Sequence, residues 1–205
     1  MAEQITFKAD GFQLEGIIDR ISEERAVIIT HPHPQYGGDM YNSVVSSIQT
    51  AYSNMQYSTL RFNFRGSGHS EGQFDNGIGE QRDVLAALEY LIQKGFKSID
   101  LAGYSFGAWV NAQTSSQSES FQNLIMVSPP VDFMDFNNIQ SIPMLSLVIV
   151  GSRDDFASVG NIEKVVPVWN ETAKVEIIEG ADHFYGGANE ELVNIISSRL
   201  AAESE

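Results

Sequence analysis

Short apolar runs alternate with amphipathic segments along most of this 205-residue chain. The amphipathic segments keep apolar side chains at helical spacing over residues 44–55, 84–92 and 192–200. Strands that alternate with helices of this length form a parallel sheet covered by helices on both faces, so we predict an α/β fold with a mostly parallel sheet of about seven or eight strands. The apolar runs have the length and composition of buried parallel strands, and they are residues 26–30, 59–64, 98–103, 124–128, 145–150 and 174–178.

The N-terminal segment differs, because apolar and polar residues alternate on either side of Asp10 and Gly11. An Asp-Gly pair between two alternating runs is a strong signal for a two-residue β-hairpin. We therefore expect an antiparallel hairpin at the start of the sheet. No linker, repeat or low-complexity tract interrupts the chain, so residues 1–205 are predicted to form a single domain.

The composition excludes several classes of function. The chain has no cysteine, which rules out disulfides, thiolate metal sites and a cysteine nucleophile. Its 27 acidic and 12 basic residues give a net charge of −15, and a surface of that sign repels phosphate backbones and anionic lipid. We expect neither nucleic acid nor a membrane as a partner, and the composition does not predict an oligomeric state. The first residues lack the segments of a signal peptide, and no apolar run approaches the length of a membrane helix, so a cytoplasmic protein is expected.

One serine stands between two glycines in the sequence Gly-Tyr-Ser-Phe-Gly at residues 103–107, directly after a predicted strand and before a segment that can begin a helix. A serine at the tip of a tight strand-to-helix turn crowds the residues two before and two after it, which favours glycine at both. In open α/β sheets, ligands bind beyond the carboxyl ends of the strands. The sequence therefore predicts that Ser105 is a nucleophile.

A serine hydroxyl is a weak nucleophile at neutral pH and needs an adjacent base. Folds that carry this turn place the reacting residues in the chain order serine, acid, histidine. His183 is the only histidine beyond Ser105, and it follows the predicted strand 174–178 in a loop. We therefore predict His183 as the base.

The acid that orients the imidazole should follow the strand 145–150. Asp154 and Asp155 both do, and Asp154 is preferred because its position leaves a tight turn at the strand end. Asp132 and Asp135, which follow the preceding strand, are the other candidates.

A tetrahedral oxyanion needs two hydrogen-bond donors. One is predicted to be the main-chain N–H of Phe106, the residue after the nucleophile. The second should come from the loop after residues 26–30, whose two prolines have no N–H to donate. That leaves His33, Gln35 or Tyr36, and His33 is the first choice.

These motifs together resemble the α/β-hydrolase superfamily over nearly the whole chain. "ITHPHPQYGGDM", "RFNFRGSGHSEG", "GYSFG", "GSRDD" and "GADHF" follow the order and spacing of that family. The chain is most similar to the small capless members, which are dienelactone-hydrolase-like and bacterial carboxylesterase-like. The resemblance implies a cytoplasmic serine hydrolase without cofactor or metal, which cleaves small carboxylic esters through an acyl-enzyme intermediate.

The chain departs from its relatives in two ways. Dienelactone hydrolases use a cysteine nucleophile, which this chain lacks, and many relatives carry a helical cap for which the segment after residue 128 is too short. We therefore expect the cap domain to be absent or vestigial. Phe133, Met134 and Phe136 of this segment either line an acyl groove or pack beneath the loop. Arg65, Gly66, Gly68 and His69 are predicted to build or flank a turn.

Three other functions fit parts of the sequence. His31 and His33 are spaced as a metal pair, although further ligands would have to converge on them. The same serine, histidine and aspartate serve amidases, peptidases and thioesterases. The fold also serves as a non-catalytic binding scaffold in some proteins.

Overall fold

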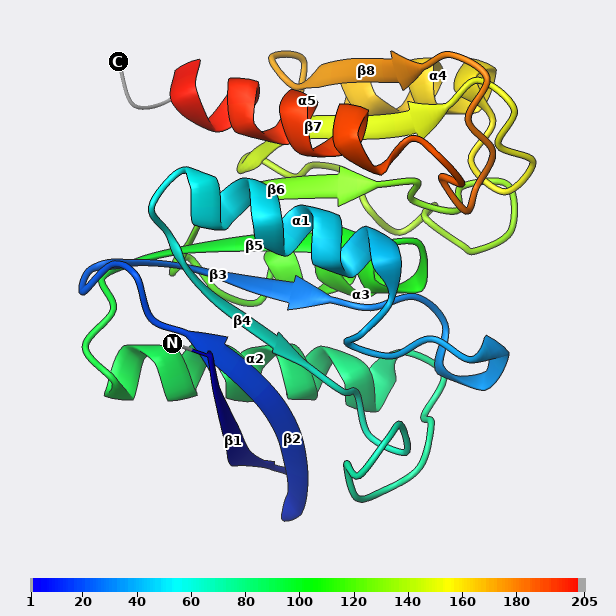
Figure 1. Cartoon of the computed structure of the whole chain (residues 1–205). Helices are drawn as coiled ribbons and strands as arrows, with labels where there is room; N and C mark the ends of the chain where they lie inside the picture. The colour runs from blue at the N-terminus through cyan, green and yellow to red at the C-terminus, as the bar shows by residue number, and fades with distance from the viewer. Residues whose placement is uncertain (1, 203–205) are drawn as a thin grey trace.

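The computed structural model describes residues 2–202, and these residues form one eight-stranded sheet between two layers of helices (Figure 1). The strand order is β1-β2-β4-β3-β5-β6-β7-β8, and the pairs from β4 to β8 are parallel. The prediction of a mostly parallel sheet is confirmed. The strands are β1 (Ala2–Ala9), β2 (Phe12–Asp19), β3 (Arg25–Thr30), β4 (Ser58–Phe62), β5 (Ser98–Tyr104), β6 (Phe121–Val127), β7 (Leu145–Gly151) and β8 (Lys174–Ile178).

The helices cover both faces of the sheet. α1 (Ser43–Asn54) and α5 (Asn189–Ala202) pack against each other on the face nearer the viewer in Figure 1. α2 (Ile78–Gln93), α3 (Phe106–Ser115) and α4 (Val159–Trp169) lie behind the sheet, and a short 3₁₀ helix, η1, spans Pro34–Tyr36. This two-sided cover explains why the central strands contain continuous apolar runs rather than an alternating pattern. In β3, Ile28 packs into the α2–α3 layer, whereas its neighbours Val27 and Ile29 pack into the α1–α5 layer.

The N-terminal hairpin forms as predicted. β1 pairs with β2 in antiparallel register, with Ala9 opposite Phe12. The two turn residues both have positive φ angles, 52° at Asp10 and 88° at Gly11. These angles are those of a type I′ turn, whose twist matches the twist of the strands that it joins.

α4 is the one long element that the sequence analysis does not predict. Its buried residues Ile162, Val166 and Trp169 do follow helical spacing. The pattern is short, however, and Pro167 lies inside it. Inside a helix, proline removes one backbone donor and crowds the carbonyl of the preceding turn, which weakens the helical signal.

The segment between β6 and β7, residues 128–144, contains turns but neither a helix nor a strand. The expectation of an absent or vestigial cap therefore agrees with the structure. Within residues 2–202, none of the helices combines the length and the apolar character that crossing a membrane requires.

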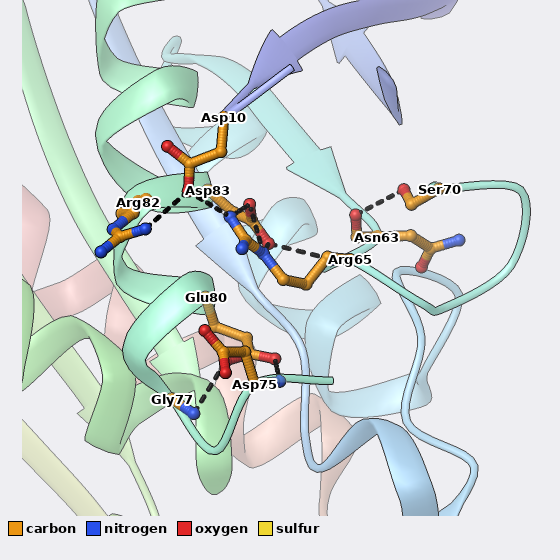
Figure 2. Close-up of polar contacts among 9 residues, drawn as sticks. All are labelled: Asp10, Asn63, Arg65, Ser70, Asp75, Gly77, Glu80, Arg82 and Asp83. Carbon is orange, nitrogen blue, oxygen red and sulfur yellow. Dashed lines mark hydrogen bonds and ion pairs between the residues drawn. The ribbon is translucent and has the colours of Figure 1, made fainter. Parts of the chain in front are cut away.

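Buried charges fix the loop that follows β4 (Figure 2). The Arg65 guanidinium donates to Asp83 of α2 over 2.7–3.1 Å, and it reaches Asp10 at the hairpin turn over 3.2 Å. At the start of α2, the Glu80 carboxylate accepts the main-chain N–H groups of Asp75 and Gly77 at 2.9 and 2.7 Å. These contacts join the hairpin, the loop and α2 into one unit.

Gly66 and Gly68 of this loop hold backbone conformations that other residues rarely adopt. Gly66 and Gly68 have φ angles of 75° and 53°, a region that favours glycine. A Cβ atom at Gly68 would collide with Asn63 and Glu15. The prediction of a turn is confirmed, and His69 is an exposed loop residue beside it.

Candidate active site

Ser105 lies at the strained junction between β5 and α3. Its φ and ψ angles are 54° and −118°, and it precedes the first residue of α3. This conformation is costly for a residue other than glycine, and such strain is concentrated at functional sites. It directs the Ser105 side chain away from the strand and toward the carboxyl edge of the sheet, where only 9% of the residue is exposed.

The two flanking glycines allow β3 to approach this turn closely. A Cβ atom at Gly103 would collide with the Thr30 hydroxyl. One at Gly107 would lie 2.6 Å from that hydroxyl and 2.7 Å from the carbonyl oxygen of His31. Both positions therefore require glycine for a packing reason, as the sequence pattern predicts.

The structure brings together the three side chains that the sequence singles out. Ser105 Oγ lies 2.9 Å from His183 Nε2. On the other side of the imidazole, His183 Nδ1 lies 2.9 Å from both carboxylate oxygens of Asp154. Because an ionised carboxylate only accepts hydrogen bonds, Nδ1 carries the proton and Nε2 is free to accept one from Ser105. These three residues come from the loops after β5, β7 and β8.

Asp154 is held by its own loop as well as by the imidazole. Its Oδ1 accepts the main-chain N–H groups of Phe156 and Ala157, each at 2.9 Å. Burial alone would raise the pKa of Asp154, but the hydrogen bonds from His183, Ser128 and Phe156 outweigh it and lower the pKa below its ordinary value. The carboxylate therefore stays ionised at neutral pH.

The other candidate acids point elsewhere. Asp155 is exposed to solvent. Asp132 accepts hydrogen bonds from Ser158 N–H and from the Asn161 side chain at the start of α4. Asp135 bonds the main-chain N–H of Asn137 within its own turn.

Phe106 and His33, the residues predicted to supply the main-chain donors, both line the cleft beside Ser105. Phe106 is the first residue of α3, a position whose N–H has no acceptor inside the helix. In the loop after β3, the Gln35 N–H bonds His33 Nδ1 and the Tyr36 N–H bonds the His33 carbonyl, at 3.2 and 3.1 Å. Of the three donors that the sequence leaves open, the His33 N–H is the one that makes no hydrogen bond among the described residues.

Aromatic packing holds these two donors in place. The His33 ring lies 4.8 Å from the Phe106 ring and 4.9 Å from the Phe74 ring. Phe74 also contacts Phe106, and it precedes the Asp75–Gly77 turn that Glu80 fixes in Figure 2. Burial lowers the pKa of His33, so its ring is neutral at pH 7. The loop after β4 thus supports the donors without reaching the cleft itself.

Ser105 and His183 open into a cleft of about 590 Å³. Among the described residues that line it, none is Asp, Glu, Lys or Arg. The exposed part of the lining consists largely of aromatic rings, at Tyr36, Phe133, Phe156 and Phe184.

Some side chains of the segment after β6 line the cleft, and others pack in the core. Phe133, at 64% exposed, and Met134 line the cleft. Phe136 is buried instead and stacks on Trp169 at a ring distance of 5.1 Å. The two alternatives that the sequence left open therefore both occur, each at different residues.

His31 is not arranged as a metal ligand. Its Nε2 accepts the Phe64 N–H at 3.0 Å, and its Nδ1 lies 2.7 Å from the Pro32 carbonyl. Both ring nitrogens are therefore bonded to the main chain, and the ring is buried. Within residues 2–202, no group of three or more His, Asp or Glu side chains is placed to hold a metal ion.

Three residues around the site were not singled out from the sequence. Ser128 bonds Asp154, Tyr185 bonds Ser128, and the Tyr104 hydroxyl donates to the His183 carbonyl at 2.7 Å. Tyr104 and Tyr185 are close in sequence to Ser105 and His183, and that adjacency was the one available hint. Nothing in the sequence indicates the contact of Ser128, because it depends on how the ends of β6 and β7 lie beside each other.

Comparisons with known proteins agree with this fold. An uncharacterized protein from Rickettsia prowazekii is 34% identical over 209 residues, which cover 96% of this chain and 88% of the relative. The structure of an α/β serine hydrolase homologue from Coxiella burnetii is 32% identical, covers 97% of both chains and has a TM-score of 0.89. An α/β serine hydrolase without a lid, from Xanthomonas campestris, is 27% identical over 98% of this chain and 94% of its own, with a TM-score of 0.90.

The family assignment rests on sequence as well as on structure. Residues 43–152 match the prolyl oligopeptidase family. This span runs from the start of α1 to the residue after β7 and includes the Ser105 turn. The chain belongs to the prolyl oligopeptidase family and, with it, to the α/β serine hydrolases.

Proposed function

We propose that this hydrolase cleaves small, uncharged carboxylic esters through an acyl-enzyme intermediate, with Ser105, His183 and Asp154 as its catalytic triad. The observation that carries the proposal is the unbroken set of contacts at 2.9 Å from Ser105 Oγ through the imidazole to Asp154, at the base of an open cleft. No cofactor is needed for this chemistry.

In the first half of the reaction, Ser105 Oγ attacks the ester carbonyl while His183 Nε2 takes its proton. The N–H groups of Phe106 and His33 donate to the oxyanion that develops. Asp154 holds the imidazole in the tautomer that leaves Nε2 free, and it stabilises the imidazolium that forms.

When the tetrahedral intermediate collapses, His183 gives its proton to the leaving alcohol, and the acyl group stays on Ser105. In the second half, this acyl-enzyme is hydrolysed. A water molecule then enters from the open cleft, and His183 removes a proton from it as it attacks the acyl group on Ser105. His183 returns this proton to Ser105 Oγ as the bond between Oγ and the acyl carbon breaks, so the alcohol and the carboxylic acid are the two products and the serine is regenerated.

The lining of the cleft supports uncharged substrates. A carboxylate on the substrate would have no cation to pair with among the residues that line the cleft, and the protein carries a net charge of −15. The rings of Phe133 and Phe156, 5.7 Å apart, offer an apolar surface for an acyl or alcohol group.

A matched pair of substrates tests this proposal. The 4-nitrophenyl esters of butyric acid and of succinic acid have the same chain length, and only the second carries a charge. We expect kcat/KM for the butyrate to exceed that for the hemisuccinate by at least about tenfold, a difference of about 1.4 kcal/mol. Equal values, or a preference for the charged ester, would contradict an uncharged substrate.

The same assay tests the role of the nucleophile. Ser105→Ala should lower kcat by roughly 10⁴-fold or more, by comparison with other triads. Ser116→Ala, at an exposed serine just beyond α3, is the matched control and should keep wild-type activity. Retention of most activity in Ser105→Ala would exclude the triad.

Amide hydrolysis is the second candidate, because residues 43–152 match the prolyl oligopeptidase family. The triad chemistry is shared, and an open cleft admits a peptide. The 4-nitroanilide of butyric acid, assayed beside the 4-nitrophenyl ester, separates the two. An ester-to-anilide ratio of kcat/KM near one would favour the amidase.

A further inference from the structure

Ser128 occupies a strained position at the end of β6. It is completely buried, and its φ angle of 46° lies in a region that favours glycine. Its main-chain N–H donates to the Ile149 carbonyl of β7 over 2.8 Å, and two prolines follow it. A serine persists in such a conformation only where its surroundings require it.

The Ser128 hydroxyl is aimed at the carboxylate of Asp154. Ser128 Oγ lies 2.6 Å from Asp154 Oδ2 and 2.8 Å from the Tyr185 hydroxyl. Because the ionised carboxylate has no proton, Ser128 must donate to it, which uses the single proton of the serine. Tyr185 is therefore the donor in the contact between the two hydroxyls.

Tyr185 joins this arrangement from the loop that carries His183. It is completely buried, and its φ angle of 57° is also in the left-handed region. Its hydroxyl lies 3.3 Å from the Ile149 carbonyl, a longer contact than the one with Ser128. Burial raises the pKa of Tyr185, so its hydroxyl keeps its proton at neutral pH and can donate it.

With the Ser128 contact, both carboxylate oxygens of Asp154 accept hydrogen bonds. Oδ1 accepts from the main chain at Phe156 and Ala157, while Oδ2 accepts from Ser128, and both oxygens face His183 Nδ1. The main-chain donors hold only one oxygen, so the Ser128 hydroxyl is what fixes the rotation of the carboxylate toward the imidazole.

We propose that Ser128 and Tyr185 are positioning residues that act through Asp154, holding its carboxylate in the orientation that receives the His183 Nδ1 proton. The proposal rests on the triad proposed above. Among the described residues, those that line the cleft include neither Ser128 nor Tyr185, so neither side chain is placed to bind substrate.

Substitutions at Ser128 and Tyr185 should therefore lower kcat and leave KM unchanged. Ser128→Ala removes a hydrogen bond to a charged group, and we expect kcat to fall by about 10- to 100-fold with KM unchanged. Tyr185→Phe removes one neutral donor and should lower kcat by about 3- to 10-fold. Ser58→Ala is the matched control, because Ser58 is also completely buried and hydrogen-bonded but lies at the start of β4, away from the site.

A double-mutant cycle separates positioning from a structural role. If Ser128 acts through the carboxylate, Ser128→Ala should change kcat by less than about twofold in an Asp154→Asn background. A fall in kcat of the same size in both backgrounds would overturn the proposal. Should Ser128→Ala fail to fold, the cycle is run with Tyr185→Phe, which keeps the aromatic ring.

A spectroscopic readout separates this proposal from the proposed function. The proton between His183 Nδ1 and Asp154 is expected to give a downfield ¹H NMR signal, and this readout does not depend on turnover. We expect Ser128→Ala and Tyr185→Phe to shift this signal or broaden it by exchange, while Ser58→Ala leaves it unchanged. An unchanged signal in both site variants would contradict the positioning role, whether or not the protein hydrolyses esters.

Discussion

His31 should make the protein sensitive to mild acid, and the structure sets the size of the effect. The ring is 1% exposed, and its Nε2 accepts the Phe64 N–H. Protonation would break that hydrogen bond and bury a charge. Burial therefore lowers the pKa of His31 to about 4, from an ordinary value of 6.5.

The direction of the pH effect follows from these two values. Between pH 6.5 and 4 the unfolded chain binds a proton at His31 that the native protein does not bind, so the free energy of unfolding falls as the pH falls through this range. A difference of about 2.5 pH units, at 1.36 kcal/mol each, amounts to about 3 kcal/mol in full. At pH 5, about 2 kcal/mol of this is already lost.

The perturbation that isolates this contribution is His31→Gln, because glutamine offers both a donor and an acceptor but does not titrate. Urea unfolding of wild type and variant at pH 7.5 and pH 5.0 gives four free energies of unfolding. The loss between the two pH values should be smaller in the variant by about 2 kcal/mol. His69→Gln, at an exposed histidine, is the control and should keep the wild-type loss. Equal losses in wild type and His31→Gln would refute the reasoning.

Three further predictions concern the site and its support. Asp154→Asn should lower kcat by roughly 10³- to 10⁴-fold, whereas Asp155→Asn should leave kcat within about twofold, as steady-state kinetics on one ester will show. Gly107→Ala should prevent labelling of the serine by a fluorophosphonate and lower the unfolding midpoint in urea, because its Cβ lies 2.7 Å from a main-chain carbonyl. Gly160→Ala is the control: its added Cβ would meet no atom within 4 Å, so it should change neither the labelling nor the unfolding midpoint. Arg65→Ala leaves a buried carboxylate without its partner and should cost about 3–5 kcal/mol of unfolding free energy in urea titration.

The order of strands and helices could be predicted because the spacing of apolar residues along the chain reflects which faces of each element are buried. The central strands read as continuous apolar runs since both of their faces are covered, and Asp10-Gly11 predicted the hairpin from its turn chemistry alone. α4 was missed because its apolar pattern is short and contains Pro167. The cytoplasmic location stays a prediction.

The positions of Ser105, His183 and Asp154 at one edge of the sheet also followed from the sequence, because parallel strands bring their carboxyl ends together. The contacts of the residues around these three could not be predicted from the sequence. The contact of Ser128 with Asp154 depends on the positive φ of Ser128 and on the packing of β6 beside β7. The division of Phe133 into the cleft and Phe136 into the core depends on a loop without regular structure, for which no periodicity exists.

The most direct test of the account is whether Ser105 is an activated nucleophile. Wild type and Ser105→Ala are incubated with a fluorophosphonate, with and without a chelator, and their intact masses are measured. The account predicts a single adduct on wild type, none on the variant, and no effect of the chelator. An unmodified wild type that is shown to be folded, or an adduct that persists on Ser105→Ala, would contradict it.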